Sequence, residues 1–260
     1  MRVVELHHEV AGDGSSSTLL LGGSLGTTLR MWDPQVQPLA ARRRVIRFDH
    51  RGHGASPTPS GPYAIDDLGN DVLELLDRLG IMRASYCGLS IGGMVGMWLA
   101  ANAPERVDRL VLICTSAHLP PASAWTDRAA VVRAAGTPEV VADAVIERWF
   151  TPGFAREHPG VVERHRAMIG ATPAEGYASC CEALAQLDLR ASLSTISART
   201  LVIAGARDPT APPVHARAIV DAIPGARLEV LDDAAHLASV QQAGAVTKLI
   251  ADHLDPPEEP

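Results

Sequence analysis

Tyr86–Cys–Gly–Leu–Ser–Ile–Gly–Gly93 joins a short apolar run to a stretch in which apolar residues recur with helical spacing. It contains Gly-x-Ser-x-Gly centred on Ser90, a pattern typical of a strand, a sharp turn and a helix. Glycines two positions either side of the serine let neighbouring backbone pass without a Cβ clash. The pattern therefore predicts a hydroxyl held clear of the sheet edge at a helix N-terminus, and Ser90 is the candidate nucleophile.

The spacing is a weak signal by itself. At ordinary Gly and Ser usage it arises by chance in about one chain in ten of this length. The alternative interpretation is an ordinary strand–helix turn with a capping serine. The apolar runs on both sides of Ser90 favour the catalytic interpretation.

Short apolar runs alternate with amphipathic stretches along the chain, which predicts a parallel sheet with crossover helices. We expect an antiparallel edge strand at 3–9. The other expected strands are 18–21, 45–48, 84–87, 107–114, 200–204 and 227–231. The expected helices of this core are 65–79, 91–102, 213–223 and 239–254.

Residues 117–199 interrupt this alternation. Helical patterns occur at 127–135, 139–149, 160–169 and 175–187, with no convincing strand. We interpret 117–199 as a helical cap over one end of the sheet, and 1–116 with 200–260 as the core domain.

Bulk properties exclude several classes of protein. The chain has 260 residues and a net charge of −7, which disfavours non-specific nucleic-acid binding. The four cysteines lack C-x-x-C spacing and no Cys/His cluster suggests a metal site, so we expect no metal. The sequence contains no signal-peptide pattern and no apolar run of membrane-spanning length, so we expect a cytoplasmic protein with no membrane partner.

A serine hydroxyl needs a base to take its proton. Of the ten histidines, His236 follows the expected strand 227–231 and precedes the last helix. Loops that follow parallel strands meet at one sheet edge, so His236 is the candidate base. Its alternative role is that of a surface loop histidine.

The acid that orients the base should follow an earlier strand at the same edge. Asp208 does so, at the end of Leu201–Val–Ile–Ala–Gly–Ala–Arg–Asp208. Asp232 and Asp233 are rivals, although their closeness to His236 in the chain disfavours a good contact with Nδ1.

Backbone N–H groups should stabilise the oxyanion that forms during acyl transfer. Ile91, directly after the candidate nucleophile, supplies one donor. The glycine-rich loop 22–26 supplies the other, with Leu25 as our choice and Ser24 as the alternative. The alternative interpretation of this loop, which we favour less, is a plain glycine-rich turn.

The segment Asp49–His–Arg–Gly–His–Gly–Ala–Ser56 looks like the D-x-R-G-x-G-x-S segment of α/β-hydrolases. More narrowly, the chain resembles bacterial 3-oxoadipate enol-lactonases of the β-ketoadipate pathway. The similar segments extend over nearly the whole chain and are 24–32, 87–93, 148–151, 175–182 and 235–238. Gly23, where the family usually has a polar residue, and Pro209–Thr210 after the acid depart from its pattern.

The resemblance implies an α/β-hydrolase fold with a helical cap and the order Ser, Asp, His for the catalytic residues. It implies hydrolysis of a small enol-lactone bearing a carboxymethyl group, through an acyl-enzyme and without a cofactor. A serine esterase, C–C bond hydrolase or perhydrolase acting on another acyl substrate is the alternative. A receptor on the same fold with slow or no turnover is a more remote one.

The substrate carboxylate would need a cation, for which a bidentate arginine is well suited. Arg133 is the first candidate in the cap and Arg128 the second, although both could lie on a solvated helix face. Trp125 and Trp149 could line the pocket or simply pack the cap. We expect a monomer or a small homo-oligomer.

Overall fold

The computed structural model describes residues 2–13 and 17–255, which form a seven-stranded sheet of order β1-β3-β2-β4-β5-β6-β7. All neighbouring strands are parallel except β1, which pairs antiparallel with β3. The edge strand begins at His8, later than the sequence predicted. The strands are β1 (His8–Ala11), β2 (Thr18–Gly22), β3 (Arg44–Phe48), β4 (Ala84–Leu89), β5 (Val107–Ile113), β6 (Arg199–Gly205) and β7 (Arg227–Leu231).

The central strands are buried along nearly their whole length. Every residue of β4 is buried, as are all but the first residues of β2 and β6. Parallel strands that helices cover on both faces are read in sequence as continuous apolar runs. This burial explains why these strands were recognisable without period-two alternation.

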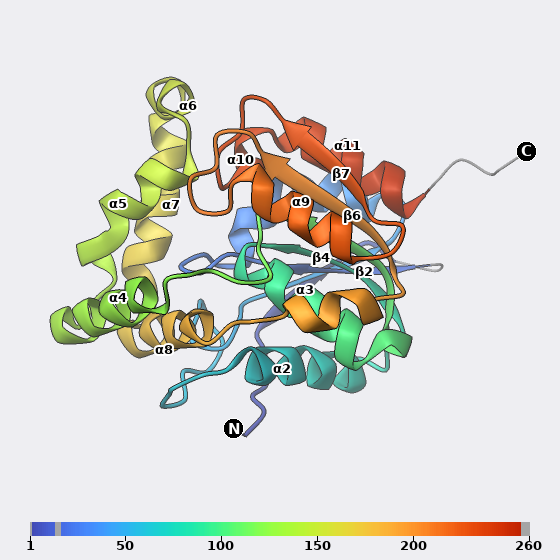
Figure 1. Ribbon diagram of the computed structural model, residues 1–260, viewed down its shortest axis with the longest axis horizontal. Helices are drawn as coiled ribbons and strands as arrows, with labels where there is room; N and C mark the ends of the chain where they lie inside the picture. The colour runs from blue at the N-terminus through green and yellow to red at the C-terminus, as the bar shows by residue number, and fades with distance from the viewer. Residues whose placement is uncertain (1, 14–16, 256–260) are drawn as a thin grey trace, which may run out of the picture.

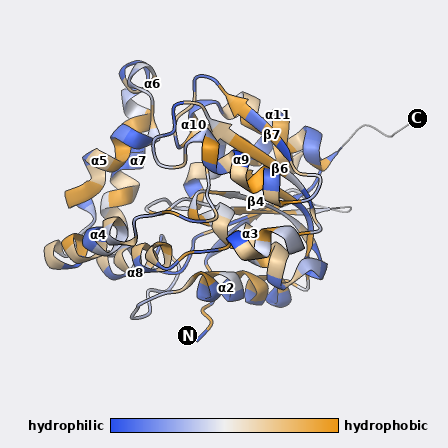
Figure 2. Cartoon of the chain, in the orientation of Figure 1, coloured by the Kyte–Doolittle hydropathy of each residue, from blue (hydrophilic) through white to orange (hydrophobic). Residues whose placement is uncertain are grey.

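Helices cover both faces of the sheet (Figure 1). Helix α3 packs against β2, β4 and β5 and against α2, while α1 packs against α11. Helix α2 alternates between hydrophilic and hydrophobic residues along its length (Figure 2). The helices of this core are α1 (Asp33–Ala40), α2 (Ile65–Arg78), α3 (Ile91–Asn102), α9 (Pro213–Ala222), α10 (Ala238–Gln241) and α11 (Ala243–Leu254), with 3-10 turns η1 (Leu29–Trp32), η2 (Pro104–Arg106) and η3 (Arg190–Thr195).

Two helical features of the core differ from the prediction. The single helix expected at 239–254 is divided into α10 and α11, because Gln242 leaves the helical conformation at φ −118° and ψ 46°. Helix α1 was not predicted, since Pro34 and Pro38 lie within its eight residues and obscure the helical pattern.

Five helices gather beside the carboxyl edge of the sheet and are called the cap below (Figure 1). They are α4 (Ala122–Ala135), α5 (Glu139–Trp149), α6 (Pro152–Glu157), α7 (Pro159–Ala171) and α8 (Ala174–Ala185). Helix α4 packs along α8, and α5 packs along α7. The short helix α6, which begins at a proline after the capping residue Thr151, was not expected.

Three glycines allow β2, β4 and α3 to meet closely. A Cβ on Gly88 would lie 2.2 Å from the carbonyl carbon of Gly92, and a Cβ on Gly92 would lie 2.3 Å from the carbonyl oxygen of Gly22. The atoms in the way are backbone, so they cannot rotate aside. Glycine is therefore required on both sides of the turn that carries Ser90.

Replacement of Gly92 by alanine should lower the free energy of unfolding by about 2–3 kcal/mol, because the new methyl group overlaps the backbone of β2. Gly244→Ala is the control. Its Cβ would meet nothing within 4 Å, and alanine in a helix should stabilise by about 0.5 kcal/mol. Urea denaturation of both variants measures the difference; equal stabilities would show that the contact at Gly92 is relaxed at no cost.

Candidate active site

Ser90 lies in the turn between β4 and α3 with φ 58° and ψ −119°, a conformation that residues with a Cβ rarely adopt. Hydrogen bonds hold this turn on both sides. The Ser90 N–H donates to the carbonyl oxygen of Ile113 at 3.0 Å, and its carbonyl oxygen accepts from Thr115 Oγ1 at 2.7 Å. Ile113, at the end of β5, and Thr115, just after it, therefore hold the turn in this conformation.

Asp208 and His236 meet at the same sheet edge, after β6 and β7 respectively. His236 Nδ1 lies 2.8 Å from Asp208 Oδ2, and both side chains are almost fully buried. The other carboxylate oxygen of Asp208 accepts from the N–H groups of Thr210 at 2.8 Å and Ala211 at 3.0 Å. The carboxylate is thus fixed by three donors.

These contacts determine the charge of the Asp208 carboxylate and the tautomer of the neutral His236 ring. Burial acts to raise the pKa of Asp208, but His236 and the two backbone N–H groups outweigh it and hold that pKa below its ordinary value. An ionised carboxylate only accepts hydrogen bonds, so the proton of the neutral imidazole lies on Nδ1. His236 Nε2 is then free to accept a proton.

The rival carboxylates have other surroundings. Asp232 and Asp233 are both exposed, and Asp233 pairs with Arg207 at 3.4 Å. Of the three candidate acids, Asp208 is the one in contact with His236.

Ser90 and His236 line one cavity between the sheet edge and the cap. The sequence had also proposed Leu25, Trp125 and Trp149 at the site, and all three line this cavity. The remaining lining residues are Ser24, Arg128, Val145, Arg148, Tyr177, Leu184 and Thr210. Val145, Arg148, Tyr177 and Leu184 were not singled out individually, because cap residues reach the cavity through helix packing that no local motif reports.

Two backbone donors are available beside Ser90. Within residues 2–13 and 17–255, the N–H groups of Leu25 and Ile91 donate to no other protein group. Their neighbours do: Gly26 N donates to His53 Nε2 at 2.9 Å, and Gly92 N donates to the carbonyl oxygen of Gly23 at 3.1 Å. The arrangement leaves the two amides that an oxyanion would need unoccupied.

Two buried histidines hold the loop that carries Leu25. His50 Nε2 donates to the carbonyl oxygen of Gly23 at 3.2 Å, while His53 Nδ1 donates to Arg51 and its Nε2 accepts from Gly26. Burial, together with the nearby His53, lowers the pKa of His50 to about 3, and burial also lowers the pKa of His53. Both rings are therefore neutral at neutral pH, and the bond that His53 Nε2 accepts from Gly26 requires a neutral ring.

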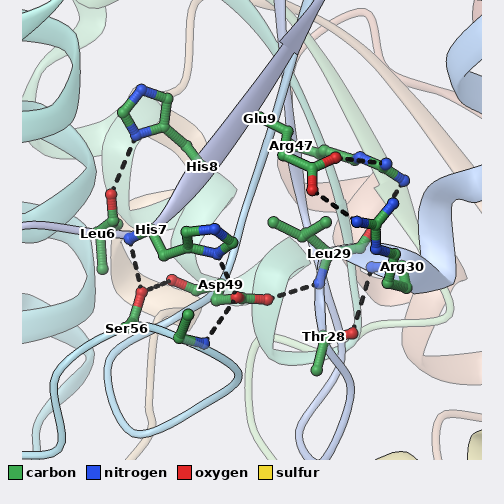
Figure 3. Close-up of polar contacts among 11 residues, drawn as sticks. Leu6, His7, His8, Glu9, Thr28, Leu29, Arg30, Arg47, Asp49 and Ser56 are labelled. Carbon is green, nitrogen blue, oxygen red and sulfur yellow. Dashed lines mark hydrogen bonds and ion pairs between the residues drawn. The ribbon is translucent and has the colours of Figure 1, made fainter.

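Asp49 ties the same region to the N-terminal segment (Figure 3). Its Oδ1 accepts from Leu29 N at 2.6 Å, and its Oδ2 accepts from Ala55 N at 3.0 Å and from His7 Nδ1 at 2.8 Å. One carboxylate thus joins the turn after β3 to the 3-10 helix that follows the 22–26 loop.

The structure corrects the choice between the two cap arginines. Arg133 does not line the cavity: its guanidinium binds Glu175 at 2.9 Å and Glu182 at 2.5 Å on α8. Hydrogen bonding to Arg133 lowers the pKa of Glu175 to about 2. Arg133 is eight residues beyond Trp125, about 12 Å further along α4, which carries it past the cavity.

Arg128 is one helical turn from Trp125 and does reach the cavity, with its guanidinium carbon 4.8 Å from the centroid of the Trp125 ring. Arg148, from α5, is the second cation on the cavity wall. Within the described part of the chain, neither Arg128 nor Arg148 forms an ion pair with a carboxylate. The cavity therefore presents two cations without acidic partners.

Across residues 2–13 and 17–255, no group of three or more His, Cys, Asp and Glu side chains is placed to hold a metal ion. In the same part of the chain, no helix has the length and apolar character needed to cross a membrane.

Residues 18–243 match the family model of the α/β hydrolase fold, and the chain belongs to that family. It is similar to 3-oxoadipate enol-lactonase 2 of Acinetobacter baylyi, with 44% identity over 243 residues, 93% of this chain and 90% of that protein. The crystal structure of the enol-lactonase from Burkholderia xenovorans has a TM-score of 0.94 and 43% identity, covering 96% of both chains. A thermophilic esterase from Thermogutta terrifontis has a TM-score of 0.91 and 30% identity, covering 96% of this chain and 93% of that one.

These relatives confirm the predicted fold class and the resemblance to enol-lactonases. The chain is a hydrolase, of the carboxylic-ester class to which enol-lactonases belong.

The buried histidines should make stability fall in acid. The pKa of His50 is about 3 in the folded chain and about 6.5 when exposed, so the unfolded chain binds more protons between these values. The free energy of unfolding should be highest above pH 6.5 and fall as pH drops towards 3. For His50→Gln, whose amide can still donate to Gly23, the free energy of unfolding should fall less steeply with decreasing pH than for the wild type. Urea denaturation at several pH values between 6.5 and 3 measures both pH dependences. Equal pH dependences would mean that His50 is protonated in the folded state.

Proposed function

We propose that this chain hydrolyses 3-oxoadipate enol-lactone, a small lactone with a carboxylate, through an acyl-enzyme on Ser90. The observation that carries the proposal is the composition of one cavity, which holds Ser90 and His236 together with Arg128 and Arg148, neither of which pairs with a carboxylate of the described residues. The similarity to enol-lactonases along nearly the whole chain, cap included, supports the same substrate class.

In the first step, His236 Nε2 takes the Ser90 proton as Oγ attacks the lactone carbonyl carbon. The N–H groups of Leu25 and Ile91 stabilise the oxyanion, and Asp208 stabilises the imidazolium. The bond between the carbonyl carbon and the ring oxygen breaks, and the oxygen leaves as an enolate. His236 returns the proton, the enol becomes a ketone, and the acyl group remains as an ester on Ser90.

In the second step, water enters the cavity and His236 takes one of its protons. The resulting hydroxide attacks the Ser90 ester, and the same two amides hold the second oxyanion. The ester bond breaks, Ser90 recovers its proton from His236, and a product with two carboxylates leaves. The net reaction is the addition of one water, and each step uses groups of this chain.

Arg128 is our choice for the substrate carboxylate. A guanidinium can bind a carboxylate through two parallel hydrogen bonds, and stacking on Trp125 limits its freedom before the substrate arrives. Arg148 and Trp149 complete the wall from α5.

Ser90→Ala should lower turnover by about a millionfold, because it removes the atom that forms the acyl-enzyme. Spectrophotometric assays on freshly generated enol-lactone and on nitrophenyl acetate measure the loss, with Ser123→Ala on the exposed face of α4 as the control. Retention of more than a few per cent of activity would remove Ser90 as the nucleophile. Faster turnover of neutral esters than of the lactone by the wild type would favour the esterase alternative, and no turnover the receptor.

Arg128→Ala should raise KM for the lactone by about ten- to a hundredfold, the usual cost of a lost charge-assisted hydrogen bond. KM for nitrophenyl acetate, which has no carboxylate, should change little. Arg133→Ala is the matched control in the same helix: it should leave both KM values near wild type, since its partners are Glu175 and Glu182. Equal losses on both substrates would exclude Arg128 from carboxylate binding.

A further inference from the structure

The C-terminal end of α5 lies directly against the loop that carries His236. The His236 N–H donates to the carbonyl oxygen of Arg148 at 3.3 Å, and the Leu237 N–H donates to that of Trp149 at 3.0 Å. Arg148 and Trp149 line the cavity, so the wall of the cavity and the loop of the candidate base are bonded to each other through their main chains.

One side chain, Gln241 at the end of α10, makes four further bonds across this junction. Its Oε1 accepts from Thr151 N at 3.3 Å and from Ala235 N at 3.2 Å. Its Nε2 donates to Thr151 Oγ1 at 2.7 Å and to the carbonyl oxygen of Asp233 at 2.7 Å. Gln241 therefore joins the stretch that leads into His236, at Asp233 and Ala235, to the buried Thr151 between α5 and α6.

The orientation of this amide is determined by its partners. Two backbone N–H groups require an oxygen on one side, and the Asp233 carbonyl requires an N–H on the other. The adjacent Gln242 is chemically identical but makes a single side-chain bond, from its Nε2 to the Asp233 carbonyl at 3.2 Å. Within the described residues its side chain forms no hydrogen bond to the cap or to Ala235, and it provides a matched control.

We propose that Gln241 is a positioning residue: through Thr151, Ala235 and Asp233 it holds the His236 loop and the Arg148–Trp149 wall as one unit. The proposal rests on the proposed function, because it gives His236 the role of base. Base and wall are then placed by the same contacts, and the distance from His236 to Ser90 depends on a side chain that lies outside the cavity lining.

Gln241→Met keeps the length of the side chain and removes all four hydrogen bonds. It should lower kcat by about ten- to a hundredfold on both the lactone and nitrophenyl acetate, because both reactions need the same correctly placed base. Gln242→Met should retain wild-type kcat and KM. A Gln241→Met enzyme with a lower Tm and an unchanged kcat would overturn the proposal, since that is the signature of a purely structural residue.

A double-mutant cycle tests whether Gln241 acts through the cap. Thr151→Val removes the hydroxyl partner, and its effect on kcat should be non-additive with that of Gln241→Met if both break one link. Additive effects would overturn the coupling. If Gln241→Met fails to fold, Thr151→Val alone decides: a loss of kcat on both substrates supports the link, and wild-type kinetics overturns it.

Labelling with a fluorophosphonate separates this proposal from the proposed function, because the reagent reacts with a serine activated by its base and needs no substrate recognition. Slower labelling of Gln241→Met than of the wild type and Gln242→Met supports the positioning role. Equal labelling of all three overturns it while leaving Ser90 as the nucleophile. A wild-type chain that does not label at Ser90 overturns the proposed function itself.

Discussion

The backbone turn at Ser90 is the constraint on which the rest of the site depends. Its φ of 58° is tolerated because Gly88 and Gly92 admit backbone where any other residue would place a Cβ. The same close approach brings Gly22, at the end of β2, against the first turn of α3. The loop with the Leu25 amide is thereby delivered beside Ser90, so one steric requirement places both the hydroxyl and a candidate oxyanion donor.

Polar side chains then hold the surrounding loops. His50 and His53 bond to the two ends of the 22–26 loop and remain neutral through burial, while Asp49 links that region to the N-terminal segment. On the other side of the cavity, Gln241 bonds the His236 loop to the cap. The bonds of His50, His53 and Asp49 satisfy groups that could not be buried unpaired. Both sets of bonds hold a loop that supplies a cavity-lining residue, Leu25 on one side and His236 on the other.

The electrostatics of the cavity differ from those of the molecule. The chain carries a net charge of −7, yet the cavity wall presents Arg128 and Arg148 without carboxylate partners. Arg133, on the same helix as Arg128, is neutralised by two glutamates of α8. Local pairing, and not the overall charge, decides which cations are available to an anionic ligand.

The sequence by itself determined the parallel sheet, the helical stretch between β5 and β6, and the likeness of Ser90, Asp208 and His236 to a nucleophile, acid and base. These features depend on local patterns: an apolar run, a glycine spacing, or a polar residue directly after a strand. The tertiary structure alone decided that Arg128 and not Arg133 reaches the cavity, that Asp208 contacts His236, and that Gln241 bonds the cap. Those outcomes depend on how helices pack and which partners neutralise each charge, and contacts between distant parts of the chain leave no periodic signal in it.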